Sequence, residues 1–372
     1  MNILFCTLYL AHAGTEKQLM TLIEGLDKST FIPHLCCIKK SAIEPTFAKD
    51  ALSLFRDIKC RKIQLDFKSF RHIPSIFSIL KLSGYIRKNQ IDIVVSYFID
   101  PTIIGFFSSK LSLHRPLVVS CFRDLGLLRD SQYNILMRWI YHHIPYFLAN
   151  SEAVKKNYVY YDRIPPDKIS VIYNGLDIGR FKKIQQTSEE PSVVGIIANL
   201  NRHVKRIDIF LRAASYICEK RRDVSFIVIG EGELKRDLMS LSSRLGIENR
   251  VNFVGRAYNI ENYLSQIHIG VNTSETEGFS NVILEYLASG IPVIATDTGG
   301  NREIIVDNEN GFLFTVNDYR ALGDKLILIL DNEILSSKLC SNARRSVEGR
   351  FENSIMIRNY ETFFSEIARN KQ

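Results

Sequence analysis

The sequence lacks several features that would point to a particular class of protein. It contains no run of eighteen consecutive apolar residues, so no membrane-spanning helix is expected. Its seven cysteines are odd in number and scattered, which favours free thiols in a reducing compartment over a disulfide framework. No cysteines and histidines have the spacing of a zinc site, and no Asp-x-Asp pair suggests a catalytic metal. We therefore expect a cytoplasmic protein that needs no metal.

The first fourteen residues, MNILFCTLYLAHAG, are largely apolar and end in small side chains, as secretory signals do. They lack the basic segment with which such a signal begins, and their apolar core is short. Four apolar residues then recur at helical spacing, namely Leu19, Leu22, Ile23 and Leu26. This pattern favours a strand, a turn and a helix over a signal peptide.

Positive charge is concentrated in the first half of the chain. Residues 1–170 contain 23 Lys and Arg against 14 Asp and Glu, whereas the remaining residues contain 25 against 26. Within the region Arg56 to Lys88, nine basic residues are interleaved with Phe and Ile side chains. Two interpretations of this region stay open: contact with an anionic membrane surface, or a solvated helix face with a buried opposite face. Nucleic-acid binding is not expected, because no recognised motif accompanies the charge.

At 372 residues the chain can form two or three domains, each with its own core. Apolar strands alternate with periodic helices, which predicts parallel βαβ units and an α/β fold. In the first half we predict a helix at 15–26 and strands at 2–7, 35–38, 93–96, 117–121 and 146–150. In the second half we predict strands at 193–199, 225–230, 251–256, 267–271 and 291–295. The polar segment 178–191 is predicted to link domains of residues 1–177 and 192–350.

Two carboxylates, Glu277 and Glu285, stand eight positions apart in the sequence SETEGFSNVILEY. Predicted buried strands lie on either side, so the segment should be a loop followed by a helix, with Ser280 or Asn281 as the N-cap. Eight helical residues rise by about 12 Å, too far for the two carboxylates to share a proton. They suit the two ends of one elongated ligand that offers hydroxyl groups. The alternative is that Glu277 caps a loop and Glu285 is a solvated helix residue.

This element resembles the E-x7-E element of glycosyltransferase family 4, whose members are retaining GT-B enzymes. The resemblance implies that Glu277 lies against the donor sugar and that Glu285 accepts the ribose hydroxyls of the nucleotide. It implies two Rossmann-like domains facing each other across a cleft, with a last helix within residues 351–372 that crosses back to the first domain. The expected activity is transfer of a sugar from a nucleotide diphosphate sugar to a hydroxyl of a cell-surface polysaccharide or a lipid-linked glycan.

Other motifs along the chain resemble the same family. Gly14 and Glu16 match its GlyGly-x-Glu turn, which faces the donor diphosphate, but Ala13 replaces the first glycine. Lys205 matches a lysine that binds the diphosphate, whereas Asn199 stands where the family usually has an arginine. Arg202 either replaces that arginine or is a surface charge. The remaining residues expected to bind the donor are Arg256, near the nucleotide base, and Gly278, Phe279, Ser280 and Asn281.

The loop at 121–126, CFRDLG, lacks the histidine that many family members have close to the reacting sugar. Arg123 could bind a phosphate or an acidic acceptor, and Asp124 could orient the acceptor or act as a base. The alternative, which we favour, is an ion pair between the two residues.

For the whole chain, two further functions stay open: a UDP-N-acetylglucosamine epimerase of the same fold, or a non-catalytic partner subunit. A peripheral position on the cell membrane fits the expected acceptor.

Overall fold

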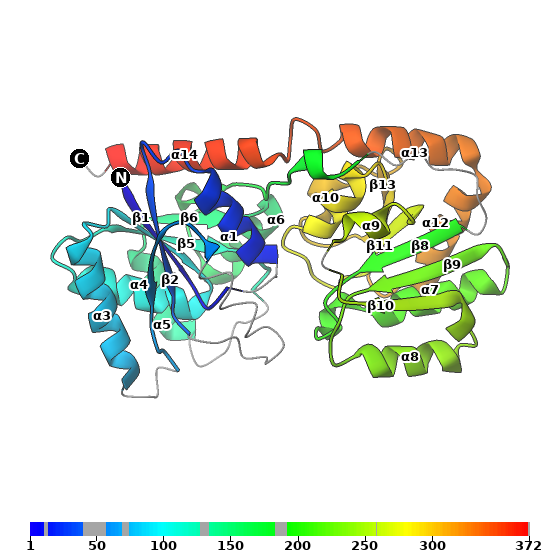
Figure 1. Ribbon diagram of the computed structural model, residues 1–372, viewed down its shortest axis with the longest axis horizontal. Coiled ribbons are helices and arrows are strands. Elements are labelled where there is room, and N and C mark those ends of the chain that lie inside the picture. The colour runs from blue at the N-terminus through cyan, green and yellow to red at the C-terminus, as the bar shows by residue number, and fades with distance from the viewer. Residues whose placement is uncertain are drawn as a thin grey trace. The chain divides into compact units, whose positions relative to one another are not determined.

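The computed structural model describes residues 1–10, 14–39, 57–68, 74–126, 134–182, 192–257 and 259–370. The chain forms two compact units (Figure 1). Unit 1 consists of Met1–Gly175 and Asn353–Gln372, and unit 2 consists of Leu176–Glu352. Most of the predicted linker, together with Ala13, Phe55 and Phe70, lies outside the described residues.

Unit 1 is built on a seven-stranded parallel sheet in the order β3-β2-β1-β4-β5-β6-β7. Its strands are β1 (Asn2–Thr7), β2 (Ile32–Cys37), β3 (Arg61–Gln64), β4 (Ile93–Tyr97), β5 (Leu117–Phe122), β6 (Tyr146–Ala149) and β7 (Ile169–Val171). Its helices are α1 (Gly14–Gly25), α3 (Pro74–Lys88), α4 (Ile99–Leu111), α5 (Asn134–His143), α6 (Glu152–Asp162), η1 (Pro166–Lys168) and α14 (Asn353–Arg369). Because the first strand and the first helix form as predicted, residues 2–7 and 14–25 are part of the fold.

Both faces of this sheet are covered by helices, which explains why its strands are almost continuously apolar. On one face, α1 and α14 pack over Phe5 and Tyr97. The ring centroids of Phe5 and Phe364 are 6.1 Å apart, so the last helix belongs to the core of unit 1, as predicted. On the other face, α3 packs beside α4, and α4, α5 and α6 share one apolar cluster. Figure 1 shows α14 and α3 on opposite sides of the sheet.

Unit 2 has a six-stranded parallel sheet in the order β10-β9-β8-β11-β12-β13. Its strands are β8 (Ser192–Ile197), β9 (Val224–Ile229), β10 (Val251–Gly255), β11 (Ile269–Asn272), β12 (Val293–Thr296) and β13 (Gly311–Phe314). Its α-helices are α7 (Ile207–Cys218), α8 (Lys235–Arg244), α9 (Glu261–Leu264), α10 (Asn281–Ala288), α11 (Asn301–Ile304), α12 (Tyr319–Asp331) and α13 (Glu333–Arg345). Short 3₁₀ turns are η2 (Ile178–Arg180), η3 (His203–Lys205) and η4 (Glu248–Arg250).

The strands that sequence patterns failed to predict are β3, β7 and β13. Each has only three or four residues, and β3 reads RKIQ at the edge of its sheet. Such segments are too short for a period of two to be recognised, and a polar edge strand lacks the apolar signal of a central one. Their pairing with a longer neighbour makes them strands.

One carboxylate is buried in unit 1. Glu16 lies in the first turn of α1 and is 6% exposed. Burial raises the pKa of Glu16 to about 7, although a hydrogen bond from its own backbone amide acts in the opposite direction. The folded chain therefore binds this proton more tightly than the unfolded chain does, for which the ordinary value is 4.5. The contribution of protonated Glu16 to the free energy of unfolding is fully present below pH 4.5 and is lost as the pH rises through about 7.

We therefore expect Glu16→Gln to stabilise unit 1 above pH 7, by up to about 3 kcal/mol, and to have little effect near pH 4.5. Denaturant unfolding followed by tryptophan fluorescence measures this, because the chain's single tryptophan, Trp139, lies in α5 of unit 1. Glu24→Gln, which changes an exposed carboxylate of the same helix, is the control. An equal effect of Glu16→Gln at both pH values would contradict the assignment.

Candidate active site

Glu277 lies in the loop between β11 and α10, whose two ends are fixed by side-chain hydrogen bonds. At the start of the loop, Asn272 Oδ1 accepts from the amide of Ser274 at 3.1 Å. At its end, Ser280 Oγ accepts from the amide of Ile283 at 3.4 Å, so Ser280 is the N-cap of α10, as predicted. Asn272 Nδ2 also donates to Ser280 Oγ at 3.3 Å, which ties the two ends together.

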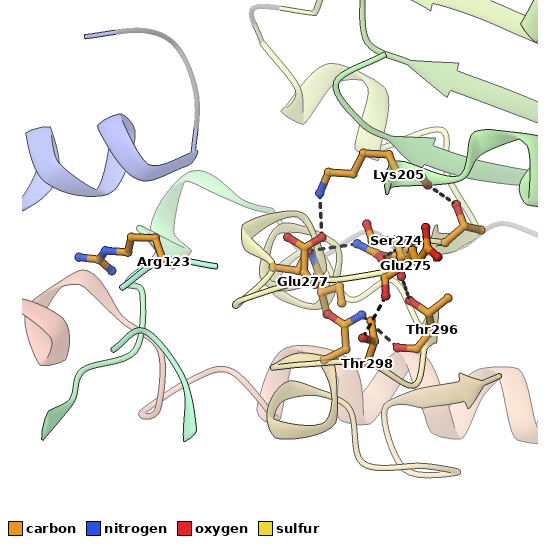
Figure 2. A network of polar contacts seen from close by, with 12 residues as sticks. Arg123, Lys205, Ser274, Glu275, Glu277, Thr296 and Thr298 are labelled. Carbon is orange, nitrogen blue, oxygen red and sulfur yellow. Dashed lines mark hydrogen bonds and ion pairs between the residues drawn. The ribbon is translucent and has the colours of Figure 1, made fainter. Parts of the chain in front are cut away.

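Glu277 is paired with Lys205, which ends the 3₁₀ turn η3 after β8. The Lys205 Nζ donates to Glu277 Oε2 at 2.7 Å, and the two side chains are only 20% and 14% exposed (Figure 2). Backbone contacts hold the two loops in this position. Thr273 Oγ1 donates to the carbonyl of Lys205 at 2.8 Å, and the amide of Glu275 donates to the carbonyl of Val204 at 2.8 Å. The ion pair is therefore placed by loop contacts that do not involve the two charges.

A third loop, between β12 and α11, supports the same segment from its other side (Figure 2). Thr296 Oγ1 donates to the carbonyl of Ser274 at 2.5 Å, and Thr298 Oγ1 donates to the carbonyl of Glu275 at 3.2 Å. The amide of Gly300 donates to the carbonyl of Glu277 at 3.2 Å. Successive carbonyls of the loop thus have partners, which restricts the directions available to the Glu277 side chain.

Glu285 lies inside α10 and is only 7% exposed, so it is not the solvated helix residue of the alternative interpretation. The neighbouring Tyr286 fixes the rotation of this helix. Its hydroxyl donates to the carbonyl of Gly195 in β8 at 3.0 Å. Its ring lies so close to β11 that a Cβ atom on Gly270 would approach the ring to 2.5 Å. Only a glycine leaves room for the ring at that position.

Two family models match the chain, one on each half. The model described as Glycosyltransferase Family 4 matches residues 13–180, and the model described as Glycosyl transferases group 1 matches residues 177–346. Between them they include the loops of Glu277 and Lys205 and almost all of both sheets. This chain belongs to glycosyltransferase family 4. It is therefore a nucleotide-sugar glycosyltransferase, as the motifs implied.

Several named proteins and solved structures are similar to this chain over most of its length. An α-1,4-N-acetylgalactosaminyltransferase of Campylobacter jejuni, named for an undecaprenol-diphosphate-linked glycan, is 27% identical over 93% of each chain. The N-acetyl-α-D-glucosaminyl L-malate synthase of Bacillus anthracis is 27% identical over 78% of each chain. A glycosyltransferase structure from Rickettsia africae matches with a TM-score of 0.84 at 20% identity over 99% of each chain. HepE of Anabaena, in complex with UDP-glucose, matches with a TM-score of 0.83 at 21% identity, over 98% of this chain and 100% of HepE. These structures identify the fold as GT-B, as predicted.

Apart from Gly14 and Glu285, the other residues predicted to bind the donor lie in the loops of unit 2 or at the start of α10. Asn199 and Arg202 are exposed in the loop after β8, and Asn199 Oδ1 accepts from the amide of Asn201 at 2.8 Å. Arg256 is half-buried directly after β10. Gly278, Phe279 and Ser280 are buried, and Asn281 is half-buried as the first residue of α10. The structure brings Lys205 and Glu277 into contact; Gly14 lies exposed at the first residue of α1, in unit 1.

Arg123 and Asp124 do not form the ion pair that we favoured from the sequence. Asp124 Oδ1 accepts instead from the amide of Gly126 at 2.7 Å, a local bond that an aspartate readily forms two residues along the chain. Arg123 donates to Asn174 Oδ1 at 3.0 Å and to the hydroxyl of Tyr360 in α14 at 2.5 Å. Burial opposes the charge, but the phenols of Tyr360 and Tyr97 outweigh it and raise the pKa of Arg123. Arg123 therefore anchors the last helix of unit 1.

Sequence reasoning missed the residues that support the site. Thr273, Thr296 and Thr298 bind backbone carbonyls, and Tyr286 fixes α10. A signal for the last two threonines was the polar TDTGG segment directly after a predicted strand.

Within the described part of the chain, no group of three or more His, Cys, Asp or Glu side chains could hold a metal ion. Among the same residues, no helix is both long and apolar enough to cross a membrane.

We expect Arg123→Met to lower the free energy of unfolding by about 2–4 kcal/mol, because it removes the two hydrogen bonds that the guanidinium donates to the buried side chains of Asn174 and Tyr360. Denaturant unfolding followed at Trp139 measures the change. Arg115→Met, at an exposed position before β5, is the control. If Arg123→Met unfolds like the wild type but loses transfer, Arg123 acts on a substrate and not as an anchor.

Proposed function

We propose that this family 4 enzyme transfers a sugar, with retention at the anomeric carbon, from a UDP-sugar to a hydroxyl of a lipid-linked glycan. The observation that carries the proposal is the Lys205–Glu277 ion pair, held by three loops beside the start of α10. Support for the uridine nucleotide comes from a relative named as a UDP-Gal transferase and from HepE with UDP-glucose. Support for the acceptor comes from relatives named for diphospho-undecaprenol-linked glycans.

In the proposed mechanism the donor replaces each partner of the ion pair. The ammonium of Lys205 and the carboxylate of Glu277 are largely buried, so each needs a partner, and without a ligand they satisfy one another. A diphosphate beside Lys205 supplies a stronger anionic partner, and the cation then stabilises the departing nucleotide. Glu277 is released to accept hydrogen bonds from the hydroxyls of the sugar. Donor binding thus turns an internal contact into two contacts with the substrate.

The remaining predicted residues are assigned by their positions. Glu285, buried in α10, would accept the ribose hydroxyls, and the backbone from Gly278 to Asn281 would face the diphosphate at the start of that helix. Arg202 would assist Lys205, and Asn199 and Arg256 would complete the donor site. Gly14 would approach the diphosphate from the first turn of α1, and Asp124 would orient the acceptor. We further propose that the enzyme is cytoplasmic and peripheral on a membrane, where a lipid-linked acceptor would lie.

The exchange of partners predicts opposite effects of the two charges on binding of UDP. Lys205→Met should weaken UDP binding, because the diphosphate loses its cation. Glu277→Gln should strengthen it, because the lysine is released from its internal partner. Both variants should lose at least about 100-fold in transfer rate, as expected when a charge that acts in the transition state is removed. Calorimetry with UDP and a transfer assay measure the two effects.

Glu275→Gln, in the same loop but with an exposed side chain, is the matched control and should resemble the wild type. If Glu277→Gln and Lys205→Met weaken UDP binding equally, the ion pair is only a structural contact. Wild-type transfer in either variant would remove that residue from the mechanism.

Choice of nucleotide is tested by the thermal stability of the wild-type chain with UDP-, GDP- and ADP-sugars. Only the UDP-sugars should raise the melting temperature, because a ligand at a given concentration stabilises the folded state more when it binds more tightly. A larger shift with a GDP- or ADP-sugar would overturn the uridine assignment and leave the family membership unchanged.

A further inference from the structure

Exposed apolar side chains of unit 1 are concentrated on one of its two helical layers. Among the described residues, ten large apolar side chains of this unit are exposed, and all but Ile32 lie on α3, α4, α5 or α6 or in the loop directly after α4. On the opposite layer, the described residues of α1 and α14 contribute none. We call α3, α4, α5 and α6 the outer layer. Its exposed residues are Ile76, Phe77, Leu80, Leu111, Leu113, Ile135, Trp139, Tyr160 and Tyr161.

The exposed side chains of the outer layer point away from the sheet. On α3, Ile76 and Leu80 are four residues apart and share one side of the helix, whereas Leu82 and Ile86 are buried on the other side. On α5, Ile135 and Trp139 are also four residues apart and lie on one side of the helix. These four exposed residues are 57%, 53%, 87% and 49% exposed, respectively. The layer therefore has two apolar surfaces, one toward the sheet and one toward solvent.

Aromatic contacts hold part of the outward surface in place. The ring of Trp139 is stacked on Phe107 of α4, with centroids 6.3 Å apart and 18° between the planes. The same ring lies 4.4 Å from His143, and Lys110 lies 5.6 Å from the centre of the Phe106 ring. Tryptophan and tyrosine have an apolar ring with a polar edge, which suits the boundary between water and lipid headgroups.

The charge of the outer layer is positive. Its four helices contain seven Lys and Arg against three Asp and Glu, and α3 contains no acidic residue. Among the acidic residues, Asp100 lies 3.7 Å from Lys39. A second copy of the chain would place this positive surface against itself, which like charges oppose. An anionic lipid surface complements both the charge and the exposed apolar side chains.

We propose that the outer layer of unit 1 is a docking surface for an anionic lipid bilayer. The apolar side chains enter the headgroup boundary, and the Lys and Arg side chains contact the anionic headgroups. This surface includes α3 from the region Arg56 to Lys88 that the sequence suggested and extends it to α4, α5 and α6. Phe67 of that region is 3% exposed, in the core beneath α3, whereas Ile135 and Trp139 lie far along the chain from it. The proposal does not depend on which sugar is transferred.

Sedimentation with vesicles tests the proposal. The full chain should bind vesicles of phosphatidylcholine mixed with phosphatidylglycerol, less at high salt, and should bind pure phosphatidylcholine weakly. The double variant Phe77→Ser, Leu80→Ser should lose most of the binding, and Arg138→Glu, at an exposed position on α5, should reduce it. The matched control is Leu328→Ser, Ile334→Ser, which removes two exposed apolar side chains of unit 2 and should bind as the wild type does.

Transfer to a water-soluble acceptor should be unchanged in the docking variants, whereas transfer to an acceptor embedded in anionic vesicles should fall. This comparison separates docking from the proposed function, because loss of the soluble reaction would point to the active site. Failure of the wild type to bind anionic vesicles overturns the proposal. Equal binding by the double variant and the wild type overturns it as well. A dimer in sedimentation velocity that the double variant abolishes would assign the surface to a second copy of the chain.

Discussion

The site in unit 2 depends on one ion pair, between Lys205 and Glu277. Their side chains are mostly removed from water, so each charge requires a partner, and the contact at 2.7 Å supplies it. Threonine hydroxyls and backbone amides hold the loops on either side through carbonyl groups, without using the two charges. The loops therefore keep their shape independently of the ion pair, as the proposed exchange of partners requires.

Helix α10 connects this pair to the sheet. Ser280 caps its first turn, and Tyr286 reaches the carbonyl of Gly195 from the middle of the helix. The absence of a side chain at Gly270 gives the tyrosine ring its space. Because the helix is fixed at its start and in its centre, Glu285 has a defined direction although it lies inside a buried segment. A displacement of α10 would move the loop of Glu277 with it.

Unit 1 shows a different use of buried charge. The Arg123 guanidinium joins Asn174, near the end of the first segment of this unit, to Tyr360 in the helix that completes the unit. The contact brings residues 237 positions apart into one hydrogen bond. On one face of the sheet, α1 and α14 expose no large apolar residue among those described, whereas the outer layer exposes nine. The two faces of one sheet thus have different chemistry toward solvent.

Patterns of neighbouring residues were enough to predict the long central strands, the α/β class and the loop and helix that carry Glu277 and Glu285. The division into two Rossmann-like units was expected from the chain length and from the resemblance to family 4. The sequence also placed the N-cap at Ser280 or Asn281, which depends on one polar side chain before an apolar helix. The partners of the charged side chains, in contrast, depend on how the elements pack. Lys205 forms an ion pair with Glu277, 72 positions along the chain, and Arg123 donates hydrogen bonds to the distant Asn174 and Tyr360 and not to the adjacent Asp124. The physical reason is that a buried charge is satisfied by whichever group the packed elements bring within reach, and distance along the chain does not determine that choice.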